Sequence, residues 1–276
     1  QESQLILKRA EVRLPSIKGL SLDDQGQWQH WLDADQKIAI LQISVFDNRT
    51  PAELNDTLTR LQQQGLKGLV LDLRGNPGGM LVPCVKVAQM FLKEGTIVQV
   101  RGRAPDQNLT YSAGATSTAP FAELPLVVLI DSTTASAAEI LAAAVKDNNR
   151  AILVGERTFG KGSVQSIFPL SGSGSALKLT TAQLFSPSGQ PLHRSPDAKS
   201  WGVDPQDGFF VPLTAEQRTT RQKAQLDRET GRLKLPQPVT IEFAEKDLAD
   251  PSLAAALKTM SAKLKTGEFA KTGRPI

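Results

Sequence analysis

Residues 68–79 read GLVLDLRGNPGG, an apolar run that passes directly into a loop. The first half, GLVLDL, is typical of a short buried strand, because an apolar run bounded by turn residues favours that structure. The second half, RGNPGG, combines glycines with a proline, and neither a helix nor a strand accommodates that composition. A helical pattern follows over residues 81–92. The stretch therefore predicts a strand, a tight loop and a helix in succession.

The same succession recurs along the first part of the chain, with a second helix expected at residues 136–146. The apolar strands are expected at residues 37–46, 68–73, 96–101, 124–130 and 151–154. Such repeated units favour a largely parallel sheet flanked by helices. After residue 160 the pattern changes, and we expect antiparallel strands at 164–170, 176–185 and 209–213 and helices at 214–235 and 252–265. The predicted fold class is α/β with an antiparallel strand extension.

Composition excludes several classes of protein. The 276 residues, 40% hydrophobic and 22% charged, are ordinary for a globular protein of one large or two small domains. The net charge of +4 is small and no basic face is clustered, so we expect no nucleic-acid partner. The longest apolar run, near residues 124–130, is far shorter than the roughly 18 residues that span a bilayer. The first methionine is Met80, which indicates a fragment or a processed form.

Cysteine and histidine are scarce. Cys84 is the single cysteine, so the chain forms no internal disulfide and no cysteine-based metal site. His30 and His193 are the only histidines, and any histidine-dependent mechanism must use one of them. The serine-based mechanism considered below would need neither a metal nor another cofactor.

Residues 131–140, DSTTASAAEI, join an expected strand to an expected helix and allow two interpretations. Ser136 and Glu139 form a Ser-x-x-Glu capping box, in which the serine caps the helix and the glutamate reaches back. A serine at such a turn is also exposed at the edge of the sheet, where the amides and dipole of the helix favour developing negative charge. The neighbouring alanines, Ala135 and Ala137, leave room for a substrate. Ser136 is accordingly a candidate nucleophile as well as a cap.

A serine nucleophile needs a base, and the candidates lie downstream. Lys161 stands between two glycines in residues 155–165, GERTFGKGSVQ, and can act as a base if its surroundings favour the neutral amine. Gln165 shares a strand face with Lys161 and could hold the amine by a hydrogen bond. His193, in a loop beside a cationic residue, is the alternative base. Gly-x-x-x-x-Gly-Lys also begins a phosphate-binding loop, but the required Ser or Thr is displaced by one position and a strand pattern follows.

Three stretches together resemble the C-terminal processing (tail-specific) peptidase family, whose members are serine proteases with a serine/lysine dyad. They are residues 71–79, 136–140 and 155–165, and the resemblance extends over about residues 37–260. It implies a crotonase-like (Clp-protease-like) core and endopeptidase action near substrate C-termini. It makes Ser136 the nucleophile, Lys161 the base and Gln165 the residue that orients the base. The oxyanion hole would use the Ala137 amide and an amide of Gly78 or Gly79.

The resemblance also implies an organisation and a partner. Residues 1–36 would be an N-terminal segment that ends a missing PDZ domain, 37–213 the peptidase core, and 214–276 an extension packed on the core. The partner would be a protein or peptide with an accessible C-terminus, met outside the cytoplasm in periplasm, cell envelope or thylakoid lumen. Two other readings stay open. One is a non-catalytic binding or scaffold protein on a peptidase-like core, and the other is an acyl-CoA enzyme of the wider crotonase-like fold, which would not need the Ser/Lys pair.

Overall fold

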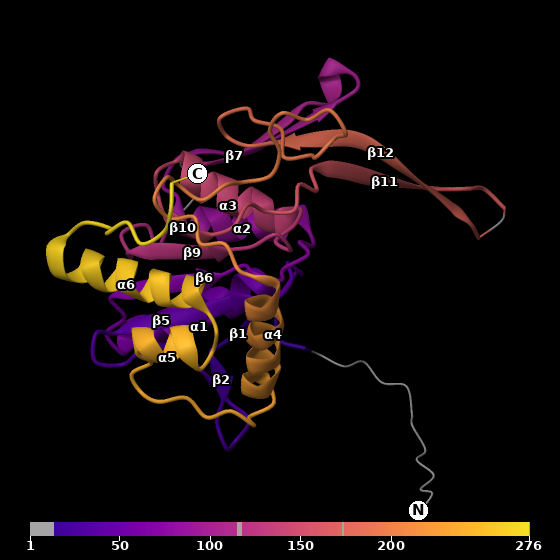
Figure 1. The fold of residues 1–276 in the computed structure, drawn as a ribbon. Helices are drawn as coiled ribbons and strands as arrows, with labels where there is room; N and C mark the ends of the chain where they lie inside the picture. Colours follow the sequence, from indigo (N-terminus) through magenta and orange to yellow (C-terminus); the bar gives the residue numbers. More distant parts are fainter. Residues whose placement is uncertain (1–13, 115–117, 173, 276) are drawn as a thin grey trace, which may run out of the picture.

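The computed structural model describes residues 14–114, 118–172 and 174–275 (Figure 1). Of the N-terminal segment 1–36 that we expected to end a PDZ domain, residues 1–13 lie outside the described part of the chain and residues 14–36 lie within it.

A six-stranded sheet forms the centre of the molecule. Its strands follow the order β1 (Ile17–Lys18), β5 (Ile38–Ile43), β6 (Gly68–Asp72), β9 (Leu126–Ile130) and β10 (Ile152–Gly155), and β4 (Trp31–Asp33) also pairs with β5. Strands β5, β6, β9 and β10 run parallel, whereas β1 and β4 are antiparallel to β5. The parallel strands are almost entirely buried, as continuous apolar runs such as LVVLI in β9 predict. The predicted α/β class with a largely parallel sheet is confirmed.

Helices cover both faces of this sheet, as Figure 1 shows for the face under α5 and α6. Alternate residues of each strand serve opposite faces. In β6, Leu69 and Leu71 join the core formed with α1 (Thr50–Gln63), α2 (Leu81–Phe91) and α3 (Ala137–Asp147). Val70 joins the other core, formed with α5 (Ile241–Lys246) and α6 (Pro251–Thr266). The parallel sheet is thus the middle layer of three.

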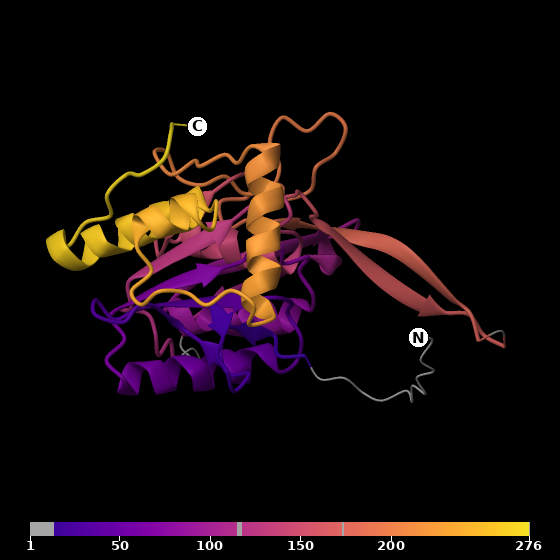
Figure 2. The same ribbon diagram turned by 60° about the horizontal axis from the view of Figure 1, so that its bottom comes forward.

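A second, antiparallel sheet lies beyond α2 and α3. Its order is β11 (Ser163–Pro169), β12 (Ala176–Phe185), β7 (Gly95–Gly102) and β8 (Leu109–Ala113). Strands β11 and β12 extend from the body as a long hairpin (Figure 2). We expected β7 among the parallel strands, but it pairs with β12 and β8 instead. The described part of the chain also contains a two-stranded sheet, formed by β2 (Ser21–Leu22) and β3 (Trp28–Gln29), and a 3-10 helical turn at Pro105–Gln107.

Two sequence-based expectations for the C-terminal part need correction. The strand predicted at residues 209–213 does not form, because Phe210 makes only single bridges with Gly155 and Arg274. Pro212 lacks the N–H that would continue a ladder. The helix predicted at 214–235 is α4 (Ala215–Glu229), which ends earlier than expected, just before the left-handed Gly231.

Candidate active site

Three loops meet at the carboxyl edge of the parallel sheet, where ligands bind in open α/β sheets. They follow β6, β9 and β10. Hydrogen bonds join them in series: the Ala135 N–H donates to the Asn76 carbonyl at 2.9 Å, and the Phe159 N–H donates to the Thr134 carbonyl at 2.9 Å. Loop residues 59 and 25 positions apart in the sequence are therefore held side by side.

Ser136 stands at the turn from β9 into α3 in a strained backbone conformation, with φ of 57° and ψ of −119°. An L-residue held in such a region costs of order 1–3 kcal/mol and persists only when its surroundings enforce it. Part of the enforcement is local, because the Ser136 N–H donates to Glu139 Oε2 at 2.8 Å. The N–H of Glu139 donates to the Ser136 carbonyl at 2.9 Å, so the serine hydroxyl is not needed as its acceptor.

Gly78 packs directly against this turn, and Gly79 packs against Phe46 in the loop that follows β5. Both have positive φ, at 104° and 132°. A Cβ on Gly78 would lie 2.6 Å from the Cβ of Ser136 and 2.9 Å from the amide nitrogen of Ala137. A Cβ on Gly79 would lie 2.2 Å from the carbonyl oxygen of Phe46. Both positions therefore require glycine for space as well as for backbone conformation.

Glu139 connects the Ser136 turn to the Lys161 loop. Its carboxylate is fully buried and accepts four hydrogen bonds. Besides the Ser136 N–H, the donors are the Thr158 hydroxyl at 2.6 Å, the Gly160 N–H at 2.7 Å and the Lys161 N–H at 2.7 Å. Burial raises the pKa of Glu139 above its ordinary value, and these hydrogen bonds act in the opposite direction.

One cavity of about 300 Å³ collects nearly all of the predicted site residues. Ser136, Ala137, Gly79, Lys161 and Gln165 line it. Its remaining wall is largely apolar, with Leu81, Ile140, Ser163, Val164, Lys178 and Leu184. Ser136 is half-buried, whereas Lys161 and Gln165 are exposed on the open side.

The amides at the cavity differ in availability. The Gly78 N–H donates to Asn76 Oδ1 at 2.8 Å and is already used. Within the described part of the chain, the N–H groups of Gly79 and Ala137 donate no hydrogen bond, and both residues line the cavity. Gly79 sits in a parallel bridge with Phe46, in which the flanking residues make the hydrogen bonds and leave its own N–H free. These two amides are therefore available to a developing oxyanion.

The structure also bears on the alternative sites. His193 does not line the cavity. Lys161 is followed by strand β11, whereas a phosphate-binding loop requires a helix there. Among the residues that the structure describes, no three His, Cys, Asp or Glu side chains are grouped as a metal site requires.

Sequence reasoning missed several contributors to this site. Glu139 was identified only as half of a capping box, although it also fixes the Gly160 and Lys161 amides more than 20 residues away. Lys178 was not singled out, yet it places a second cation in the cavity wall. Strand pairing explains why Lys178 lies near Gln165 in the cavity wall. Ile167 lies opposite Lys178 in the β11–β12 ladder, and Gln165 lies two residues before Ile167 on the same face.

Comparison with known proteins gives a consistent result. A sequence model of peptidase family S41 matches residues 37–206. The chain is 36% identical over 228 residues to a carboxyl-terminal-processing protease of Synechocystis, a match covering 81% of this chain and 49% of that protein. It is 37% identical over 176 residues to a chloroplastic C-terminal processing peptidase of Tetradesmus obliquus, covering 63% of this chain and 36% of that protein.

A solved structure is similar as well. The photosystem II D1 C-terminal processing protease matches with a TM-score of 0.59 and 31% identity, over 74% of this chain and 50% of that one. The chain thus spans about half the length, or less, of the relatives it matches. In the described ranges, no helix has the length and apolar character needed to cross a membrane.

Proposed function

The chain belongs to peptidase family S41, and we propose that it is the peptidase core of a carboxyl-terminal processing protease. In this proposal it is a serine endopeptidase that cleaves peptide bonds near the C-termini of proteins. The observation that carries the proposal is the single cavity lined by Ser136, Lys161 and the free amide of Gly79.

The reaction is acyl transfer. The Ser136 hydroxyl attacks the carbonyl carbon of the scissile peptide, and neutral Lys161 takes the hydroxyl proton. The Gly79 and Ala137 amides donate to the oxyanion. Collapse of the tetrahedral intermediate breaks the C–N bond, and Lys161 returns the proton to the leaving amine. Water then hydrolyses the acyl-enzyme, with Lys161 again serving as base.

The strained backbone of Ser136 supports its role as nucleophile. A residue used only as a helix cap adopts an ordinary extended conformation, as Thr214 does before α4 with φ of −69° and ψ of 163°. Ser136 caps α3 at the additional cost of its φ of 57°, which directs the hydroxyl-bearing carbon toward Gly78 and the cavity. Strain maintained at such a place is characteristic of functional sites.

The exposure of Lys161 is consistent with a base that becomes shielded from water only when a substrate binds. A peptide lying across the cavity would exclude water from the Lys161 amine, and exclusion of water favours the uncharged form that accepts a proton. Gln165 follows on the same strand and offers an amide, which can hold the amine without fixing its charge as a carboxylate would. We therefore assign Gln165 the orientation of Lys161.

The substrate that this cavity favours is a protein or peptide chain with an accessible C-terminus, as the names of the relatives indicate for those proteins. We also propose a location outside the cytoplasm, as the resemblance to C-terminal processing peptidases implies; one relative is named chloroplastic.

Cleavage of an unfolded protein such as casein by the wild type and by Ser136→Ala tests the function. We expect cleavage by the wild type alone, with the products consistent with release of C-terminal fragments. Equal cleavage by both proteins would refute the assignment of Ser136. Cleavage by neither would favour a binding or scaffold protein on the same fold, and labelling of wild-type Ser136 by a fluorophosphonate would decide against that reading.

A further inference from the structure

Helix α4 is docked onto the core by charge rather than by an apolar stripe. Its sequence, AEQRTTRQKAQLDRE, is strongly polar, and its three buried residues are Arg221, Ala224 and Arg228. A helix that packs on a protein core usually presents a stripe of aliphatic side chains. Buried arginines are found inside proteins when they are paired, so the partner of Arg221 shows what holds the helix here.

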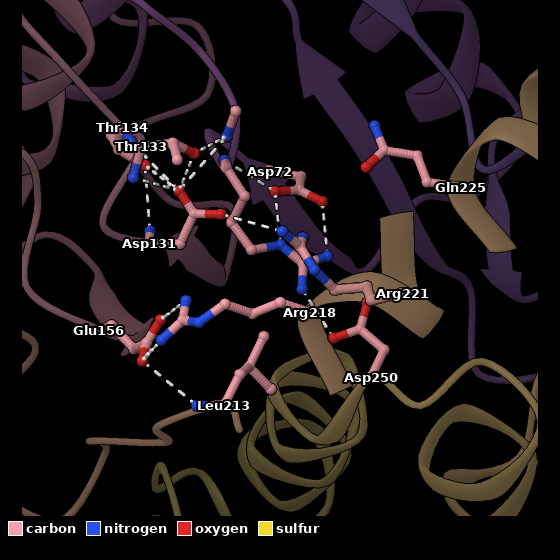
Figure 3. A network of polar contacts seen from close by, with 12 residues as sticks. Asp72, Asp131, Thr133, Thr134, Glu156, Leu213, Arg218, Arg221, Gln225 and Asp250 are labelled. Carbon is pink, nitrogen blue, oxygen red and sulfur yellow. Dashed lines mark hydrogen bonds and ion pairs between the residues drawn. The ribbon is translucent and has the colours of Figure 1, made fainter. Parts of the chain in front are cut away.

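The partner of Arg221 is Asp131, the first residue after β9. Arg221 Nη2 lies 3.0 Å from Asp131 Oδ2, and the two side chains are only 10% and 5% exposed (Figure 3). An ion pair removed from water in this way is costly to break from one side, because the remaining charge stays buried without its partner.

The other oxygen of Asp131 holds the loop that leads to Ser136. Asp131 Oδ1 accepts hydrogen bonds from the Thr133 N–H at 2.9 Å, the Thr133 hydroxyl at 2.6 Å and the Thr134 N–H at 3.1 Å. The Thr133 hydroxyl in turn accepts the Gly75 N–H at 3.1 Å. Asp131 therefore fixes the turn before Ser136 and, through Thr133, the loop that carries Gly79.

The ionisation of Asp131 is consistent with this arrangement. Burial alone would raise the pKa of Asp131, but the hydrogen bonds from Thr133 and the charge of Arg221 hold it below its ordinary value. The carboxylate is thus charged, with Oδ2 paired to Arg221 and Oδ1 accepting hydrogen bonds from the loop.

We propose that Arg221 is a positioning residue for catalysis, which acts through Asp131 to hold the Ser136 turn and the Gly79 loop in register. The inference rests on the proposed function of the Ser136 site. Arg221 does not line the cavity. It also lies beyond residue 206, where the match to the family model ends, so this support comes from the part of the chain outside that match.

The chain contains a matched control on the same helix. Arg218, one turn before Arg221, makes two hydrogen bonds of 2.6 Å to Glu156 after β10. Glu156 also accepts the Leu213 N–H at 3.2 Å, and among the described residues its carboxylate makes no hydrogen bond to the Ser136 turn or the Gly79 loop. Loss of Arg218 therefore loosens the docking of α4 without removing the partner of Asp131.

The test compares Arg221→Met, Arg221→Lys and Arg218→Met with the wild-type chain. The kcat and KM for a peptide substrate are measured well below the unfolding temperature, and kcat is normalised to the sites that a fluorophosphonate titrates. A displacement of about 1 Å at a reacting group can cost about a hundredfold in rate. We expect Arg221→Met to lower the normalised kcat by about tenfold to a hundredfold with little change in KM. Arg218→Met should stay within about twofold of the wild-type normalised kcat, because its partner Glu156 does not hold the Ser136 turn or the Gly79 loop and the reacting groups keep their positions.

Arg221→Lys should recover most of the lost kcat, because the pair uses one hydrogen bond of 3.0 Å and a lysine can replace a single-bonded arginine. A wild-type kcat for Arg221→Met would overturn the inference, as would equal losses in Arg221→Met and Arg218→Met. Absence of fluorophosphonate labelling in the wild type would overturn the proposed function and this inference with it. Labelling of the wild type together with an unimpaired Arg221→Met would overturn the inference alone.

Discussion

Gly78→Ala is expected to damage both catalysis and stability. The backbone of Gly78 has φ of 104°, where a Cβ costs roughly 1–2 kcal/mol. The new Cβ would lie 2.6 Å from the Cβ of Ser136, about 0.8 Å short of the 3.4 Å at which ordinary contact begins. Relief of that overlap brings the total cost to about 2–4 kcal/mol, in line with other overpacked sites. It also moves the Ser136 turn or the Ala137 amide by several tenths of an ångström.

Because a displacement of about 1 Å can cost about a hundredfold, a shift of several tenths of an ångström at the reacting atoms predicts a loss of about tenfold in kcat. Unfolding entropy of about 2.1 cal/mol/K per residue converts the stability cost into a fall of about 3–7 °C in Tm. Gly65→Ala is the matched control, since Gly65 has φ of 90° but no atom within 4 Å of the added Cβ. It should lose about 2–3 °C in Tm and keep the wild-type kcat. Peptide cleavage and thermal unfolding of both variants measure these quantities, and a Gly78→Ala enzyme with wild-type kcat would refute the assigned geometry.

Three further predictions follow from single side chains. Lys161→Ala should abolish turnover while Tm changes by about 1 °C or less, because the side chain is exposed and replacement of an exposed side chain costs within about 0.5 kcal/mol. Turnover equal to wild type would eliminate Lys161 as the base. Glu139→Ala leaves the Ser136, Gly160 and Lys161 amides without their acceptor. Thermal unfolding should therefore show that the free energy of unfolding falls by about 3–6 kcal/mol, and casein cleavage should disappear. Wild-type stability together with wild-type cleavage would contradict the bridging role of Glu139. Burial, assisted by the charge of Arg60, lowers the pKa of His30 to about 4, so the folded protein holds a neutral imidazole. As the pH falls below 6.5, the unfolded chain therefore takes up a proton on His30 before the folded protein does. Stability should therefore fall by about 3 kcal/mol between pH 6.5 and pH 4, and His30→Gln should flatten that part of the denaturation profile.

The sequence predicted the parallel core because its strands are uninterrupted apolar runs with glycine and proline at their ends. Residues 124–130 are an example: LPLVVLI gives β9 at Leu126–Ile130, buried on both faces. The placement of β7 was not predictable in the same way. An apolar strand pattern indicates that residues 96–101 are extended and partly buried, but it does not specify which sheet supplies the partner strand. Only the pairing of β7 with β12 and β8 settles it.

The candidate site was predictable to the extent that its residues lie in short contiguous stretches. Ser136 was identified from the strand-to-helix turn that carries it, and Gly78 and Gly79 from the resemblance to the peptidase family. The structure brings them together at one edge of the sheet. The partners of Asp131 and Glu139 could not be found from local patterns. Arg221 is 90 residues from Asp131 and the Lys161 amide is 22 residues from Glu139. Such pairs depend on how separate elements pack, and a single sequence carries no period or spacing that marks them.

The buried polar groups of this site are best understood together with the strain at Ser136. A turn with φ of 57° relaxes unless its neighbours prevent it, and small aliphatic contacts cannot fix a backbone dihedral. Hydrogen bonds are directional, so the shared carboxylates of Glu139 and Asp131 can fix one. Glu139 binds the turn from the Lys161 side, and Asp131 binds it from the α4 side. Each carboxylate has its charge stabilised by several donors or by Arg221, which makes its burial tolerable. Two buried acids thus provide, from opposite sides, the directional support that keeps the Ser136 turn in a conformation it would not adopt by itself.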